Sequence, residues 1–206
     1  MTINLDLLDE ESATQAIKTI AELAQANGID WALIGGLAVA LYGSDRNTKD
    51  IDIIATKLLP LENQGRLKQG GERYNIKTDK RVVTVDWIIR NDEFKSLFQE
   101  ALKESVKIGD VPVLTPEWLV ILKFIAGRFK DQEDAVFLLS RKGLVNREII
   151  KEKITALFGK AAWGLAKHGY QSWFDIADGR TCEEERNKAE GYNKRLGKKF
   201  QSVTNI

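Results

Sequence analysis

The stretch that decides the fold is Trp31 to Ala55, WALIGGLAVALYGSDRNTKDIDIIA. An apolar run that ends at Ile34 leads into a pair of glycines and then into a short piece compatible with a helix, which Gly43 ends. A second apolar run opens at Asp50. This order predicts a strand, a glycine turn, a short helix, a loop and a second strand.

Two aspartates, Asp50 and Asp52, begin the second of these strands. Alternate side chains of a strand share a face, so the two carboxylates lie side by side while Ile51 and Ile53 point into a core. Like charges held this close repel each other, and a cation between them removes the repulsion. Hard oxygen ligands suit Mg²⁺ or Mn²⁺, so the pair predicts a metal site.

The glycine pair, Gly35 and Gly36, supplies a complementary feature. It allows backbone N–H groups at the start of the following helix to face an anion such as a triphosphate. Each of these two motifs alone has other interpretations. Asp-x-Asp also binds the metal and diphosphate of sugar nucleotides in many glycosyltransferases, and it can be a solvated strand face. Gly-Gly is often only a turn. The sequence has no G-x-G-x-x-G, which argues against a dinucleotide-binding fold.

A Gly-Gly pair, thirteen intervening residues and an Asp-x-Asp strand together resemble the DNA polymerase beta-like nucleotidyltransferase superfamily. The form GGLAVALYG, followed by Arg46, Thr48 and DID, is most similar to the bacterial abortive-infection (AbiEii-like) nucleotidyltransferases. The resemblance covers roughly residues 28 to 139. It implies an α/β (α+β) fold with a small, mixed, twisted sheet, flanking helices and a helical C-terminal bundle. We expect a nucleotidyltransferase core at 1–114 and a helical region at 115–206.

In this superfamily a third carboxylate comes from a later strand, and Asp86 in RVVTVDWII is the matching residue. Strand alternation places it on the opposite face from Val83 and Val85, where it can line a cleft. The resemblance implies that Asp50 and Asp52 hold two Mg²⁺ or Mn²⁺ ions, and that Asp86 completes the second metal site and takes a proton. The implied reaction transfers a nucleoside monophosphate from an NTP to an acceptor hydroxyl and releases pyrophosphate.

The expected phosphate partners are the glycine turn at Gly35 and Gly36, together with Arg46 and Lys123. Ser44 is a weaker candidate, because many family members place a serine next to the second glycine of the motif, where this chain has Gly36. Lys123 has an alternative reading as a surface lysine whose stem lies beside the core.

Two further stretches carry charge. Phe129-Lys130-Asp131 with Asp134 resembles another family motif, and we interpret it mainly as a helix start and polar surface, with substrate contact as the alternative. The segment 181–200 mixes six cations with aromatic residues, a pattern that could bind RNA, although glutamates in its first half favour a solvated helix.

The remaining elements follow from periodicity and turn residues. We expect a first helix capped by Ser12, a short helix within 57–71, and a hairpin of 73–77 with 81–89. A helix within 92–104 and two short strands around Gly109 and Asp110 follow. A helix over 118–129, started by Thr115 and Pro116, should bury Trp118, Leu119, Leu122 and Ile125. Three helices should then cover 147–158, 161–176 and 181–200.

Composition constrains the class of protein. Thirty-one basic and thirty acidic residues give a formal net charge of +1, which neither supports nor excludes nucleic acid binding. A single cysteine, Cys182, excludes an intramolecular disulfide, and one histidine with one cysteine cannot form a His/Cys zinc site. We find neither a signal peptide pattern nor a membrane-spanning run, and expect a cytoplasmic protein.

The acceptor is not specified by any motif. Members of the superfamily modify tRNA ends, aminoglycosides, proteins and other nucleotides. The abortive-infection likeness implies a toxin that acts on tRNA and is paired with an antitoxin protein. The alternative is a nucleotide-binding or partner-binding module that has kept the fold without catalysis, although the presence of all three carboxylates favours an enzyme.

Overall fold

The structure of the protein is a computed structural model that describes residues 7–180. Its helices and strands, in chain order, are α1 (Glu10–Ala26), β1 (Trp31–Ile34), α2 (Gly35–Leu41), β2 (Asp50–Ala55), β3 (Gly65–Arg66), β4 (Gly71–Lys77), β5 (Val82–Ile88), α3 (Lys95–Lys103), β6 (Val106–Ile108), β7 (Val111–Val113), α4 (Pro116–Ala126), α5 (Phe129–Ser140) and α6 (Arg147–Ala177).

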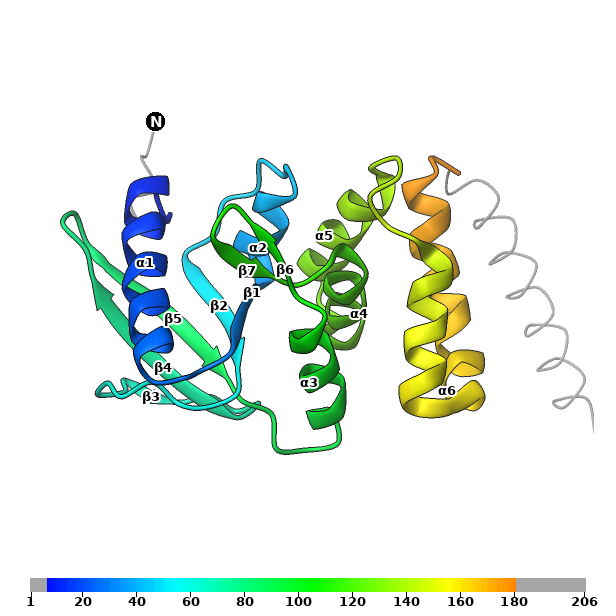
Figure 1. Cartoon of the computed structure of the whole chain (residues 1–206). Coiled ribbons are helices and arrows are strands. Elements are labelled where there is room, and N and C mark those ends of the chain that lie inside the picture. Colours follow the sequence, from blue (N-terminus) through cyan, green and yellow to red (C-terminus); the bar gives the residue numbers. More distant parts are fainter. Residues whose placement is uncertain (1–6, 181–206) are drawn as a thin grey trace, which may run out of the picture.

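The strands form one mixed seven-stranded sheet in the order β3-β4-β5-β2-β1-β7-β6. β2 runs antiparallel to β1 and parallel to β5, while β1 runs parallel to β7. In Figure 1, α1 lies beside β4 and β5, and α6 lies at the opposite side of the molecule. The expected α/β architecture with a mixed sheet and flanking helices is confirmed.

Strand alternation places the core as the sequence predicts. Ile51 and Ile53 of β2 are fully buried, as are Val83, Val85 and Trp87 on one face of β5. β1 is buried at all four positions, which suits its continuous apolar sequence in the interior of the sheet. Burial of this apolar surface is the main contribution to the stability of the sheet.

The described chain after Val113 contains helices and no further strand. α4 packs against α5 and α6, and α6 bends at Gly159 into two successive helices. Arg147 at the start of α6 forms an ion pair with Asp178 just beyond its end, with Nη1 and Oδ2 2.9 Å apart, so the two halves run back alongside each other. The predicted helices within 147–176 are confirmed, whereas the helix expected at 181–200 lies outside the described residues. The division into two regions at 114/115 stays a prediction.

Several local expectations are confirmed. The predicted hairpin is formed by β4 and β5, and the two short strands are β6 and β7. A helix within 92–104 is present as α3. Thr115 and Pro116 do begin α4, as the cap-then-proline pattern predicts.

The first helix does not begin at Ser12. Its N-cap is Asp9, whose carboxylate accepts a hydrogen bond of 2.9 Å from the Ser12 backbone N–H. Ser12 is itself buried in the first turn. The expected capping by Ser12 is therefore wrong, because an aspartate three residues earlier already satisfies this orphan amide.

The short helix expected within 57–71 is also absent. The chain there forms β3, in which Gly65 and Arg66 pair with Arg73 and Glu72 of β4. The sheet edge supplies backbone hydrogen-bond partners that a local reading of the sequence does not consider. Leu58 and Leu61 of this segment remain 46% and 37% exposed, as expected for side chains that no helix packs against the core.

The helix expected over 118–129 ends three residues early, whereas the helix start expected at Phe129 is confirmed. α4 ends at Ala126, Gly127 adopts a left-handed conformation with φ of 65°, and α5 begins at Phe129. Trp118 and Leu119 are buried as expected, but Leu122 is only partly buried and Ile125 is 38% exposed. The glycine acts as a C-terminal stop, which the apolar sequence before it had obscured. No helix in the described part of the chain is long and apolar enough to cross a membrane.

Candidate metal and nucleotide site

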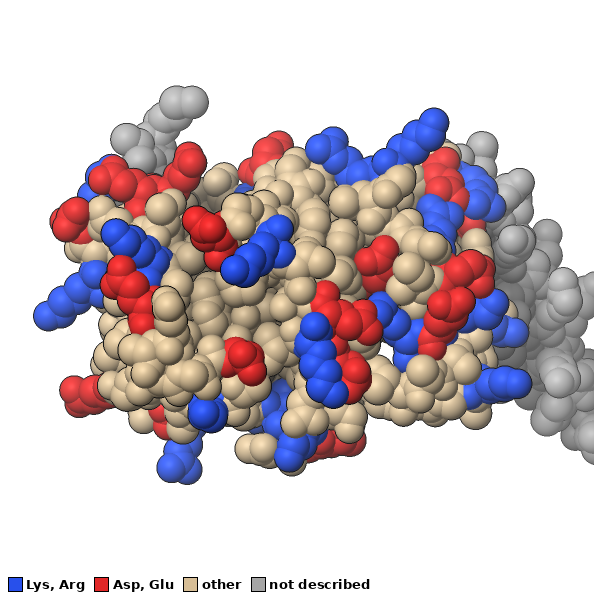
Figure 2. All heavy atoms as spheres, in the orientation of Figure 1, with Lys and Arg blue, Asp and Glu red and all other residues tan. Residues whose placement is uncertain are grey.

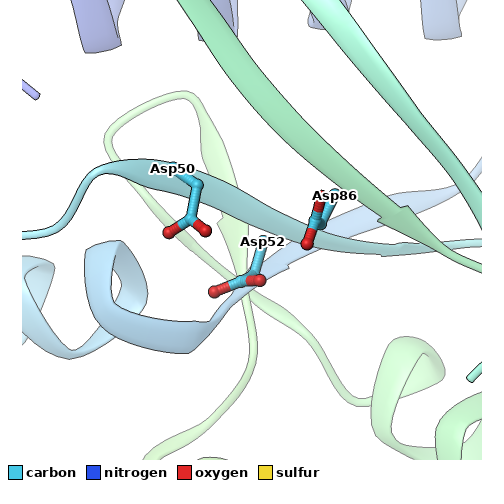
Figure 3. Close-up of side chains that lie close together, drawn as sticks. All are labelled: Asp50, Asp52 and Asp86. Carbon is cyan, nitrogen blue, oxygen red and sulfur yellow. The ribbon is translucent and has the colours of Figure 1, made fainter. Parts of the chain in front are cut away.

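The three aspartates selected from the sequence lie together at the junction of two neighbouring parallel strands. Asp52 of β2 is the register partner of Asp86 of β5, and Asp50 lies two residues before Asp52 on the same face. One carboxylate oxygen from each residue can be chosen so that all three lie within 4.8 Å of one another. Figure 3 shows the three side chains pointing into one shared space.

The electrostatics of this group fit a divalent cation. Burial raises the pKa of Asp52 to about 6, and the charges of Asp50 and Asp86 add to the effect. A cation placed between the three carboxylates would offset this unfavourable charge. An all-oxygen donor set of this kind suits Mg²⁺ or Mn²⁺ better than a softer metal.

Gly35 leaves room for the Asp52 carboxylate. A Cβ atom built on Gly35 would lie 2.0 Å from Asp52 Oδ2, and the backbone φ of +67° is one that other residues rarely adopt. A Cβ on Gly36 would lie 3.2 Å from Thr48 Oγ1 and 3.3 Å from Arg46 Cζ. The glycine pair therefore lets the start of α2 approach both Asp52 and the loop that precedes β2.

A cluster of charged side chains from three elements lies beside the carboxylates, and we call it the ion-pair cluster. Lys123 of α4 is 6% exposed, and its Nζ lies 3.2 Å from Asp131 Oδ1 and also contacts Asp134. Arg46 donates to Asp134. Arg128 donates to Asp131 through Nε at 2.6 Å and Nη2 at 3.1 Å. Each buried carboxylate of α5 is thus held by two cations.

The structure corrects the two surface interpretations made for this region. Lys123 is not a surface lysine, and Asp131 and Asp134 do not form a polar surface, because they are 0% and 4% exposed. Buried charges of this kind persist only when they are paired and hydrogen-bonded, and the partners here come from α4 and from the loop before β2. Local sequence could not reveal those partners.

Burial and pairing act in opposite directions on the pKa values of the cluster. Burial lowers the pKa of Lys123, and the charge of Asp131 opposes this effect. Burial alone would raise the pKa of Asp131, but hydrogen bonding from Arg128 and the charge of Lys123 outweigh it, so that its pKa is lowered. The charges of Lys123 and Arg128 oppose part of the rise in the pKa of Asp52. The cluster therefore lies within electrostatic reach of the three aspartates.

Two arginines at the site were missed in the sequence. Arg128 has a side chain that is 62% exposed while its guanidinium is fixed by the fully buried Asp131. Arg73 donates to both oxygens of Asp86. The signal for Arg73 was present, since a hairpin that turns at residues 78–81 pairs Arg73 with Asp86 directly across the two strands. For Arg128, the only signal in the sequence was its spacing of three residues from Asp131.

Ser44 lies in the loop between α2 and β2. Its Oγ accepts a hydrogen bond of 3.2 Å from the Arg46 backbone N–H, so it organises the loop that carries Arg46. Thr48 Oγ1 in the same loop donates to Asp50 Oδ1 at 3.2 Å and orients that carboxylate. The phosphate contacts predicted for Ser44, Arg46, Lys123 and the glycine pair stay predictions.

No family model and no curated protein matches the chain. Similar solved structures include an antigenic nucleotidyltransferase-like protein from Paracoccidioides brasiliensis, with 14% identity over 89% of this chain and 93% of that chain and a TM-score of 0.44. A candidate nucleotidyltransferase from Helicobacter pylori has 14% identity over 77% and 83%, with a TM-score of 0.47. JHP933 from Helicobacter pylori has 13% identity over 92% and 99%, with a TM-score of 0.49. None of these TM-scores reaches 0.5, so the functional inference rests on this chain's own residues.

Proposed function

We propose that this protein is a metal-dependent nucleotidyltransferase of the DNA polymerase beta-like superfamily. It moves a nucleoside monophosphate from an NTP to an acceptor hydroxyl and releases pyrophosphate. The observation that carries this proposal is the convergence of Asp50, Asp52 and Asp86 within 4.8 Å, beside a glycine turn that a side chain at Gly35 would block.

The carboxylates of Asp50, Asp52 and Asp86 would hold the metal. When bound, Mg²⁺ or Mn²⁺ neutralises charge on the phosphates and lowers the pKa of the acceptor hydroxyl. The acceptor oxygen forms a bond to the α-phosphorus while the bond from that phosphorus to the β-bridging oxygen breaks. The hydroxyl proton passes to a carboxylate, for which Asp86 is the proposed residue, and pyrophosphate leaves.

The cations at the site would bind the phosphates that depart. Arg128 is the best placed, because its side chain is largely exposed and its guanidinium is already fixed by Asp131. Arg46 and Lys123 are further proposed partners, but both are paired with Asp134, so a phosphate contact requires them to share or exchange that partner. The turn at Gly35 and Gly36, with Ser44 in the following loop, completes the proposed nucleotide-binding set.

The proposed acceptor is tRNA, in a toxin whose partner is an antitoxin protein and whose compartment is the cytoplasm. The support for this finer proposal is the abortive-infection likeness of the segment from the glycine pair to DID. Figure 2 shows acidic and basic side chains interspersed on the face it presents, without a large region of one sign among the described residues there.

The test is a transfer assay with each of the four NTPs, labelled at the α-phosphate, in the presence of Mg²⁺ or Mn²⁺ and total tRNA. We expect the wild type and Asp110→Asn, a change in the exposed turn between β6 and β7, to transfer label to RNA. Asp86→Ala should transfer none, because the third carboxylate is lost. Label on protein or on a small alcohol would redirect the acceptor. NTP binding without any transfer would contradict catalysis and favour the non-catalytic module.

A further inference from the structure

Arg73 and Asp86 form a two-point ion pair across β4 and β5. Arg73 Nε lies 2.7 Å from Asp86 Oδ1, and Nη2 lies 2.9 Å from Asp86 Oδ2. The two residues are direct register partners, so the strand pairing fixes their positions relative to each other. A planar guanidinium matches a carboxylate in this fork geometry, which makes such pairs stronger than a contact with a single donor.

The two partners differ in how much of each side chain reaches solvent. The Asp86 side chain is 12% exposed, whereas the Arg73 side chain is 48% exposed. Arg73 can therefore rotate away without burying an unpaired charge. Asp86 has no such freedom, because without Arg73 it becomes an unpaired, buried carboxylate beside Asp50 and Asp52. This arrangement is unfavourable unless another cation takes the place of the guanidinium.

We propose that Arg73 is a resident counter-ion of the carboxylate group, which exchanges with the metal for Asp86. In the metal-free protein Arg73 occupies both oxygens of Asp86 and offsets the repulsion among the three aspartates. Metal binding through Asp86 requires the guanidinium to release at least one of these oxygens. Arg73 is thus a positioning residue that weakens metal binding. This inference rests on the proposed function, because it takes the three aspartates to be metal ligands.

The proposal makes a prediction opposite to that of a merely supporting role. If Arg73 only holds Asp86 in place, its removal should disorder the carboxylate and weaken metal binding. If Arg73 competes with the metal, its removal should strengthen metal binding. The sign of the change in metal affinity therefore separates the two roles.

The experiment measures Mn²⁺ binding to the full chain without NTP, by the loss of the free-ion signal in electron paramagnetic resonance. We expect Arg73→Gln to lower the Kd for Mn²⁺ by roughly two- to fivefold relative to the wild type, the range typical of losing one partly exposed ion pair. Arg73→Lys keeps the charge but not the fork, so it should also lower the Kd, by a smaller factor.

Lys77→Gln is the matched control for the loss of one positive charge. Lys77 is exposed and lies four residues further along β4, about 13 Å away at the usual rise of a strand. At physiological ionic strength a charge beyond about 8 Å is largely screened, so the Kd for Mn²⁺ should not change. Circular dichroism of each variant checks that the fold is intact.

The outcomes distinguish the inference from the function on which it rests. If Asp52→Asn binds Mn²⁺ as well as the wild type does, the metal site itself is wrong. If Asp52→Asn loses binding while Arg73→Gln binds Mn²⁺ equally or more weakly than the wild type, the exchange is wrong and the metal site stands. If Arg73→Gln tightens binding but Arg73→Lys matches the wild type, only net charge matters and the fork contact has no role.

Discussion

Gly35 cannot be replaced by a larger residue without disturbing Asp52, since a Cβ atom there would lie 2.0 Å from Asp52 Oδ2. Gly28 provides a control, because its φ of +57° is also left-handed but an added Cβ would meet nothing within 4 Å. Both alanine variants should lose about 1 to 2 kcal/mol from the left-handed backbone. Gly35→Ala should lose about 1 to 3 kcal/mol more through overpacking.

Urea unfolding of Gly35→Ala and Gly28→Ala measures this difference directly. The thermal stabilisation by metal and NTP should also disappear in Gly35→Ala and persist in Gly28→Ala, because only the former displaces the carboxylate of Asp52, which is proposed as a metal ligand. Equal losses of unfolding free energy in the two variants would mean that Gly35 serves only the backbone turn.

Asp52 gives the protein a defined dependence on pH. Burial, together with the charges of Asp50 and Asp86, raises its pKa from 3.8 to about 6. The folded protein therefore holds this proton more tightly than the unfolded chain does. The stability that results is fully present below about pH 4 and is lost as the pH rises through about 6.

In metal-free buffer, the free energy of unfolding of the wild type should consequently fall by about 2 kcal/mol relative to Asp52→Asn between about pH 4 and about pH 7. Urea unfolding at a series of pH values checks this. Saturating Mn²⁺ should remove the difference in slope, because the ion favours the ionised carboxylate. Parallel pH profiles for the two proteins without metal would show that Asp52 titrates normally.

The residues of the site were predictable to different extents. The pairing of Asp50 with Asp52 follows from strand alternation, which is a local property of the sequence. Asp86 was selected because the family resemblance implies a third carboxylate on a later strand, and alternation gave only the face on which it lies. The burial of Lys123 and Asp134 was not predictable, because it depends on partners in three elements. A buried ion-pair cluster and a solvated helix face have the same composition, and only the packing of α4 on α5 distinguishes them.

At the level of elements, an aromatic group joins α4 to α6. Phe124 of α4 stacks on Tyr170 of α6 with ring centroids 3.9 Å apart, and Trp163 stacks on the same tyrosine at 5.7 Å. Tyr170 is buried, and burial raises the pKa of its hydroxyl above the ordinary value of 10.0. The close approach of Phe124 depends on Gly169, because a Cβ atom there would lie 2.7 Å from Phe124 Cζ.

Substitution by alanine should therefore have opposite effects on the free energy of unfolding at two glycines of α6. Gly164→Ala should raise the free energy of unfolding by up to about 1 kcal/mol, because alanine is the better helix former and nothing lies within 4 Å of the added atom. Gly169→Ala should lower it by about 1 to 3 kcal/mol, because the Phe124 ring must move. Thermal unfolding of both variants measures the effects. Stabilisation by both would mean that the ring stack has room to relax.

The elements that the sequence predicted best are those with local signals at both ends. The β4–β5 hairpin has its turn, where Thr78 Oγ1 donates to the Arg81 backbone carbonyl at 2.7 Å, and α4 has Pro116 in its first turn. β3 was mistaken for a helix because its pairing with β4 is set by the sheet edge. The end of α4 was placed three residues too late because the apolar pattern before Gly127 gives no stop signal of its own, whereas the start of α5 at Phe129 was expected.

At the scale of the whole molecule, the strand order brings the site together. β2 lies between β5 and β1, so Asp52 has Asp86 on one side and Ile34, the residue before the glycine pair, on the other. α2 packs on β2 and also contacts α4 and α5, which carry the ion-pair cluster. Strand order is a long-range property that periodicity does not contain. The class of fold was predictable from the sequence, whereas the seven-stranded order was not.

The most direct test of the proposed metal and nucleotide site is the thermal unfolding of the protein with Mn²⁺ and a non-hydrolysable NTP. Binding to the folded state alone raises the melting temperature, so saturating ligand should stabilise the wild type and the control Asp110→Asn by several degrees. Asp52→Asn should show no rise, because the central carboxylate of the proposed metal site is gone. Equal rises in the wild type and Asp52→Asn would contradict the assignment of Asp50, Asp52 and Asp86 as the metal and nucleotide site.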